Sequence, residues 1–319
     1  MIDTWHSMPE VWDSDLDRQI AAMNYEILRK PKRISWKRPF FSPSSVNSCH
    51  REMYVKFKGA LKDRNIDPPY RGRWKRLGTL FGDMIQRDLL FIWKHYENVV
   101  GEEPSFTVET TEIGDKRYPM WEKFAEKIHS EEHGGYSINF KGQPDGILRH
   151  KDGRRVGLEI KSKQTSAAKT STFSMRNPDP SHVRQCIAYA IMHDLSDYIL
   201  LYGNLSKKGW NLTDEEYMKN PDIRAFYLNI TKKEKEELLD ELSSVLEAVD
   251  TDTPPPLALD KWTFNNYKTA CALSLTDEEV SVLRKEVEAM KQKGGVPQYK
   301  VRDREQALND IEKMRSESL

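Results

Sequence analysis

The middle of the chain alternates apolar and polar residues with a period of two, and this pattern predicts a β-hairpin. Apolar residues at positions 147 and 148 begin the first strand, and aliphatic residues at 156, 158 and 160 alternate along the return strand. The dipeptide Asp152-Gly153 between them is typical of a tight hairpin turn. Alternation then places Glu159 and Lys161 on the face of the return strand opposite its aliphatic residues.

Apolar residues recur at helical spacing in much of the remaining chain, and they predict helices joined by a few further strands. The predicted helices cover residues 13–28, 43–57, 77–96 and 180–190, with others that begin at Thr231 and Thr276 and a last one that ends near 317. Further strands are predicted over residues 105–110, 136–140, 198–202 and 224–230, with a polar helical insertion at 121–132 and an exposed loop at 163–177. Leu80 and Met84 are expected on the apolar face of the helix over 77–96.

These elements predict an α/β fold in which helices flank a central mixed sheet. The chain has 319 residues, of which 38% are hydrophobic, so one elaborated domain is favoured over two. We expect an N-terminal helix and basic linker over residues 1–42, a core domain over 43–256 and a helical extension over 257–319. The charges of this extension indicate a solvated surface, and both packing on the core and binding of a partner remain open for it.

The chain carries 50 basic and 50 acidic residues, so its formal net charge is zero. A nucleic-acid partner would therefore have to bind local basic patches. One candidate patch surrounds Arg33, where aromatic residues are interleaved with the basic ones, and a second surrounds Arg73. A solvated linker is an equally good interpretation of the first patch.

The sequence gives no indication of membrane contact. It contains no run of eighteen apolar residues, and its first residues lack the basic and apolar regions of a signal peptide. We therefore expect a cytoplasmic protein, in a bacterium or, if it is phage-encoded, in the host cell.

Three ionisable residues are predicted to converge on the hairpin. Asp145 lies at the entrance of the first strand, so strand pairing brings its carboxylate near Glu159, with Lys161 two residues further on. Two carboxylates suit a divalent cation with oxygen ligands, and an ammonium group beside them suits a phosphate or an attacking water. These residue types favour a phosphodiesterase site, and we expect it at an open edge of the sheet. The alternative is a solvated face of cross-strand charges.

The same residues carry a resemblance to a known family. Gly142-Gln143-Pro144-Asp145-Gly146, followed fourteen positions after the aspartate by Glu159-Ile160-Lys161, resembles the signature of the PD-(D/E)XK nuclease superfamily. Gln185 and Tyr189, four residues apart on a predicted helix, resemble the Q-x-x-x-Y motif of its RecB-type exonuclease branch, which includes phage and CRISPR-associated exonucleases. Without the resemblance, Gln185 is a surface residue and Tyr189 belongs to an apolar stripe.

The resemblance implies a restriction-endonuclease-like core with helical N- and C-terminal extensions. It implies that Asp145, Glu159 and the Ile160 carbonyl hold Mg²⁺ or Mn²⁺, and that Lys161 orients or deprotonates the attacking water. Residues implied or suggested to contact DNA are Gln185, Tyr189, Arg33, Arg73 and Lys163. The implied activity is hydrolysis of DNA from its ends in recombination, repair or phage DNA processing, with a recombination or replication protein as partner. A structure-specific endonuclease and a catalytically weakened DNA-binding protein are the alternatives.

The chain departs from the family pattern in one helix. RecB-type nucleases usually carry G-x-x-x-H-E there, whereas this chain has Gly82 in the place of the histidine and Asp83 in the place of the glutamate. Asp83, Gln86 or water would then supply the missing metal ligand. An exposed helical carboxylate is the alternative for Asp83.

Three cysteines are too few and too scattered for a disulfide framework. Some RecB-type nucleases hold an iron–sulfur cluster, and Cys49 and Cys271 resemble the first and last ligands of that set. The two intervening positions fall on Trp262 and Asn265, which are not thiolate ligands. The sequence therefore predicts no iron–sulfur cluster and a buried, apolar role for Cys49.

Overall fold

The computed structural model describes residues 1–29, 39–64, 68–206, 209–293 and 295–317. Its centre is a five-stranded sheet in the order β1-β6-β7-β8-β9. The strands are β1 (Phe106–Val108), β6 (Gly146–His150), β7 (Arg155–Lys163), β8 (Asp197–Asn204) and β9 (Ile223–Asn229). Neighbouring strands are antiparallel except β7 and β8, which are parallel and are connected by helix α5 (Pro180–His193). A parallel pair requires such a crossover connection.

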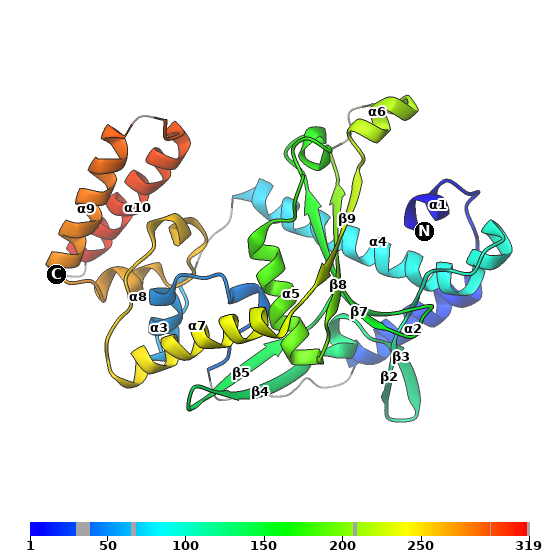
Figure 1. Ribbon diagram of the computed structural model, residues 1–319, viewed down its shortest axis with the longest axis horizontal. Coiled ribbons are helices and arrows are strands. Elements are labelled where there is room, and N and C mark those ends of the chain that lie inside the picture. The colour runs from blue at the N-terminus through cyan, green and yellow to red at the C-terminus, as the bar shows by residue number, and fades with distance from the viewer. Residues whose placement is uncertain (30–38, 65–67, 207–208, 294, 318–319) are drawn as a thin grey trace.

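Helices cover both faces of this sheet (Figure 1). On one face lies α5, backed by α7 (Lys232–Asp250), and the core between them and the sheet includes Tyr198, Leu200 and Tyr202 of β8. On the other face lies α4 (Pro69–Val100), with α1 (Ile2–His6) and α2 (Ser14–Arg29) in the same core. The predicted α/β class, with a central mixed sheet flanked by helices, is confirmed.

Two smaller hairpins extend from the central sheet. One pairs β2 (Thr110–Ile113) with β3 (Lys116–Pro119), and the other pairs β4 (Lys127–His133) with β5 (Tyr136–Gly142). The helical insertion expected at 121–132 is wrong, because only a short 3-10 turn, η2 (Glu122–Ala125), precedes β4. Gly134 and Gly135 have φ values of 58° and 82°, and this tight turn lets seven consecutive residues of β4 pair with β5.

Two predicted helices have different boundaries in the structure. The helix expected from residue 43 is a 3-10 turn, η1 (Pro43–Ser45), followed by a separate helix, α3 (His50–Phe57). Helix α4 begins at Pro69 instead of residue 77, since proline is favourable in the first turn of a helix. Its buried residues start only at Phe81, and Leu80 and Met84 are exposed, contrary to expectation, because the helix meets the sheet with a different face.

The C-terminal extension folds into helices with a core of their own. They are η4 (Leu259–Phe264), α8 (Lys268–Leu273), α9 (Asp277–Gln292) and α10 (Gln298–Ser316). This core includes Cys49, Tyr54 and Val55 at the start of and within α3, so the extension packs on the core domain (Figure 1). Thr276 accepts a hydrogen bond from the Glu279 backbone N–H, which confirms the predicted start of α9.

Two short elements, η3 (Ala167–Thr170) and α6 (Asp214–Lys219), complete the described secondary structure. Thr231 and Glu234 form the capping box that was predicted for the start of α7. In the ranges given above, no helix combines the length and the apolar composition that crossing a bilayer requires.

Close approach of α4 to the sheet depends on Gly203 of β8. A Cβ atom at this position would lie 1.9 Å from the Phe81 ring of α4. We predict that Gly203→Ala lowers the free energy of unfolding by about 1–3 kcal/mol, because the buried Phe81 ring would have to shift within a packed core. Gly72→Ala in α4 is the control, since its Cβ would meet no atom within 4 Å. It should be neutral or stabilising by up to about 1 kcal/mol, and equal destabilisation of both variants in urea would contradict this account.

Candidate active site

The start of β6 lies opposite the middle of β7 and brings the predicted acidic residues together. Asp145 immediately precedes β6, and its Oδ2 accepts a hydrogen bond of 2.7 Å from the backbone N–H of Ile160 in β7. Strand β7 is the third of the five strands, so the expectation of an open sheet edge is wrong. The reason is the crossover through α5, which places β8 and β9 beyond β7.

Alternation along β7 sorts its residues between the two faces as predicted. Leu158 and Ile160 belong to the core on the α4 side. Glu159 and Lys161 face α5, and the Lys161 Nζ lies 2.6 Å from the Glu159 Oε1. Glu159 is only 1% exposed, which excludes a solvated charge face at this position.

Gln185 of α5 connects the two charged side chains. Its Oε1 accepts a hydrogen bond from Lys161 at 2.8 Å, and its Nε2 donates to the Glu159 Oε1 at 2.7 Å. One turn later, the Tyr189 hydroxyl donates to the Gln143 carbonyl at 2.5 Å. Both residues are buried, so neither is a plain surface residue. Their polar groups hold the site and the Gly142–Gly146 segment in place, and contact with DNA stays a prediction for both.

Burial gives the two carboxyl groups unusual protonation behaviour. Burial, reinforced by the nearby charge of Asp145, raises the pKa of Glu159 from its ordinary value of 4.5 to about 8. Burial also raises the pKa of Asp145, and the hydrogen bond from Ile160 works in the opposite direction. The second oxygen of Glu159, Oε2, is buried and has no hydrogen-bond partner among the described residues. A buried polar atom without a hydrogen bond lowers stability unless a ligand supplies the missing interaction.

Because the Glu159 Oε2 has no partner among the described residues, the site suits a divalent cation. Carboxylates of Asp145 and Glu159, together with the Ile160 carbonyl, are the hard oxygen donors that Mg²⁺ and Mn²⁺ prefer. Across the described ranges, no three His, Cys, Asp or Glu side chains are already gathered closely enough to hold a metal ion. The arrangement therefore offers two carboxylates, and any further ligand must come from a neighbouring residue or from water.

Glu122 is a neighbouring carboxylate that the sequence interpretation did not identify. Burial, followed by the charges of Asp145 and Asp83, raises its pKa, so it shares their surroundings. Its φ is 46°, uncommon for a non-glycine residue, and its N–H donates to the Pro144 carbonyl at 2.7 Å. No motif points to Glu122, because it lies more than twenty residues before Asp145 and beyond the β4–β5 hairpin.

The residues around the missing histidine have different surroundings. Asp83 is exposed on α4, whereas Gln86 is buried and its Nε2 donates to the Asp145 carbonyl at 2.8 Å. A Cβ atom at Gly82 would meet no atom within 4 Å, so a larger residue is not excluded there by packing. Gln86 thus positions the backbone of Asp145, and ligation by Asp83 remains a prediction.

The remaining predicted DNA contacts are distributed unevenly. Lys163 ends β7 with its Nζ 5.2 Å from the centre of the Tyr202 ring, and burial lowers its pKa. Arg73 is exposed on α4. Arg33 lies outside the described residues. The loop expected over 163–177 is exposed in part only, because Thr170 and Met175 are buried.

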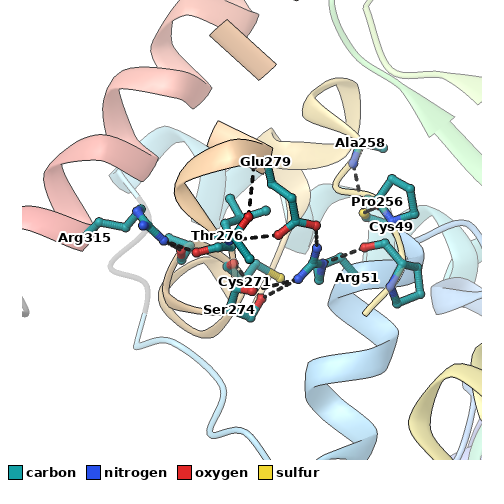
Figure 2. Close-up of polar contacts among 12 residues, drawn as sticks. Cys49, Arg51, Pro256, Ala258, Cys271, Ser274, Thr276, Glu279 and Arg315 are labelled. Carbon is teal, nitrogen blue, oxygen red and sulfur yellow. Dashed lines mark hydrogen bonds and ion pairs between the residues drawn. The ribbon is translucent and has the colours of Figure 1, made fainter. Parts of the chain in front are cut away.

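The cysteines lie in apolar surroundings. Cys49 and Cys271, both labelled in Figure 2, share the core of the C-terminal extension with Trp262. The buried Asn265 donates to the Cys271 Sγ at 3.4 Å. Burial raises the pKa of Cys271 to about 12, which keeps it a thiol in the surroundings described. The Cys49 Sγ accepts a hydrogen bond from the Ala258 N–H at 3.2 Å. The absence of an iron–sulfur cluster stays a prediction.

Comparisons with known proteins show only distant likenesses. No family model and no curated protein matches the chain. The match to the crystal structure of SSO0001 spans 82% of this chain and 97% of the SSO0001 chain, with 16% sequence identity and a TM-score of 0.40. The alkaline exonuclease LHK-Exo from Laribacter hongkongensis covers 67% and 89%, with 15% identity and a TM-score of 0.39, and its complex with dAMP gives 14% and 0.37. Likenesses this weak are no evidence for the activity of this chain.

The raised pKa of Glu159 predicts a pH dependence of stability. Between pH 4.5 and about 8, the folded state holds a proton on Glu159 that the unfolded state has lost. The free energy of unfolding, measured in urea with EDTA, should therefore fall as the pH rises through this window. In Glu159→Gln, the decrease in the free energy of unfolding across this pH range should be smaller by at least about 1 kcal/mol.

Glu112→Gln is the matched control, because Glu112 is exposed on β2. It should keep the pH dependence of the wild type. An unchanged pH dependence in Glu159→Gln would show that the Glu159 carboxyl is ionised in the folded protein throughout this range.

Proposed function

We propose that the chain is a metal-dependent nuclease that hydrolyses phosphodiester bonds in DNA. The single observation that carries the proposal is the bonded group of Asp145, Glu159, Lys161 and Gln185, in which the buried Glu159 Oε2 has no partner among the described residues. A buried carboxylate costs stability because it is removed from water, so its presence on the central strand favours a role in binding or catalysis. Cation binding beside the Lys161 ammonium group would use the charges of both Glu159 and Lys161.

Each residue of the site has a distinct role in this proposal. Asp145 and Glu159, with the Ile160 carbonyl, hold Mg²⁺ or Mn²⁺. The bound cation would polarise the phosphate and lower the pKa of a water molecule. Binding favours the ionised form of Glu159, against the effect of burial. Lys161 then orients or deprotonates the attacking water and offsets negative charge on the phosphate.

Gln185 has the geometry of a positioning residue in this scheme. It contacts both Glu159 and Lys161, so it fixes the separation of the cation ligand and the ammonium group. Tyr189 holds the segment before Asp145 in position through its hydrogen bond to the Gln143 carbonyl. These contacts account for two side chains that otherwise have no reason to be polar in a buried helix face.

The finer parts of the proposal rest on the motifs in the sequence. The order of the Gly142–Gly146, Glu159–Lys161 and Gln185–Tyr189 elements supports attack from DNA ends, in recombination, repair or phage DNA processing. A recombination or replication protein would be the partner. The Gly82 position supports the alternative of a DNA-binding protein with weakened catalysis, because an expected metal ligand is missing there.

The test is a cleavage time course on linear duplex, linear single-stranded and closed circular DNA, each with Mg²⁺, Mn²⁺ or EDTA. We expect Asp145→Asn and Lys161→Met to lower the rate at least about 100-fold. These substitutions nearly keep the size of the side chain, which matters because both residues are partly buried. Lys285→Ala on the exposed face of α9 is the control and should cut like the wild type.

The three substrates separate the alternatives. Loss of linear DNA alone, dependent on metal and on Lys161, would support an exonuclease. Cutting of circles would support an endonuclease. DNA binding without cleavage under any metal condition would reject catalysis and leave the binding protein.

A further inference from the structure

A groove of about 1330 Å³ lies between α4 and the C-terminal extension, beside the end of β7. Its walls come from three parts of the chain that are distant in sequence, namely residues 62–64 with 71–78, residues 162–169 and residues 263–268. Lys163, which ends β7, lines the groove two residues after Lys161 of the candidate active site. The groove therefore adjoins the site that the proposed function assigns to catalysis.

The groove concentrates positive charge in a chain whose net charge is zero. Among the described residues that line it, only Asp63 is acidic, and the Asp63 carboxylate accepts a hydrogen bond from the Thr269 N–H at 3.3 Å. Besides Lys75, the basic lining residues are Lys62, Arg64, Arg71, Lys163, Lys169 and Lys268. In the described parts of the chain, none of these six has a carboxylate within ion-pair distance. Such a surface attracts a polyanion.

Two aromatic side chains lie among these basic residues. Phe264, at the end of η4, is 86% exposed, and Trp74 of α4 is 38% exposed. The Trp74 carbonyl accepts a hydrogen bond from Gln164 at 3.0 Å, which ties this wall to the end of β7. A large exposed ring is unfavourable in water, and in a basic groove it is suited to stack on a base. Bases are available for stacking in a single strand, whereas a duplex stacks them internally.

A buried arginine, Arg51 of α3, contacts the C-terminal extension, the part of the chain that carries Phe264. Figure 2 shows the contacts of Arg51. Arg51 is fully buried and donates to the Pro255 carbonyl at 2.6 Å and to the Ser274 carbonyl at 2.9 Å. It also forms an ion pair with Glu279 of α9. A buried guanidinium group strongly disfavours separation of these partners. These contacts tie the C-terminal extension, which carries Phe264, to α3.

We infer that this groove binds single-stranded DNA and leads it to the active site. The inference rests on the proposed nuclease function and names the form of its substrate. Phosphates contact the basic side chains, and bases stack on Phe264 and Trp74. The C-terminal extension thereby contributes directly to substrate binding.

The test measures binding of a fluorescent oligodeoxythymidine in EDTA, so that no cleavage is required. We expect Phe264→Ala to weaken binding about tenfold, because the variant has no ring at this position on which a base can stack. The control is Tyr299→Ala, which removes an aromatic residue that is 56% exposed on α10 outside the groove, and this variant should bind like the wild type. The wild type should bind a blunt duplex of equal length more weakly than the single strand. Phe264→Ala should bind this duplex as well as the wild type does.

The basic residues are tested by the salt dependence of the same binding. Arg71→Ala and Lys169→Ala should each lower the slope of log K against log salt by about 0.7 for each phosphate that the side chain neutralises. Lys285→Ala should leave the slope unchanged. Equal binding by Phe264→Ala and Tyr299→Ala, or a wild-type preference for duplex, would overturn the inference.

These outcomes are distinguishable from failure of the proposed function. Binding that depends on Phe264 without any cleavage would reject the nuclease and keep the groove as a single-strand site. Cleavage that depends on Lys161, with normal oligonucleotide binding by Phe264→Ala, would keep the nuclease and reject the groove.

Discussion

A carboxylate in the middle of a buried strand is the constraint on which the rest of the site depends. Glu159 is almost fully buried, and burial raises its pKa strongly. Among the described residues only one of its oxygens has partners, namely Lys161 and Gln185. Replacing such a group with an apolar residue would ordinarily favour stability. The cation site proposed for Glu159 would account for this energetic cost.

The crossover between β7 and β8 explains how this carboxylate acquires its partners. Two parallel strands must be joined by a helix that returns over one face of the sheet. Helix α5 makes this return, and it places Gln185 directly over Glu159 and Lys161. The same helix carries Tyr189, which bonds to the segment before Asp145. One connection thus organises both halves of the site.

The C-terminal extension gives this compact site a longer surface. Arg51 joins α3 to the extension, and the groove forms where the extension faces α4. Positive charge gathers there although the chain as a whole is neutral. The clustering depends on three segments that the fold brings together, so total charge gives no hint of it.

The sequence by itself determined the features that follow local rules. Period-two alternation placed Glu159 and Lys161 on one face of β7, and side-chain caps located the starts of α7 and α9. Spacing of four residues put Gln185 and Tyr189 on one face of α5. The polar sequence of β4 does not predict a strand. Tertiary structure alone decided that β4 is a strand, because β5 supplies its backbone hydrogen bonds.

Tertiary structure also decided the depth of the site and the residues that surround it. Glu122 enters through a turn remote in sequence, and the groove is assembled from segments up to about two hundred residues apart. Local patterns specify which face a side chain occupies, since backbone geometry fixes that face. They do not specify what lies opposite, because packing between distant segments sets burial, charge neighbours and pKa.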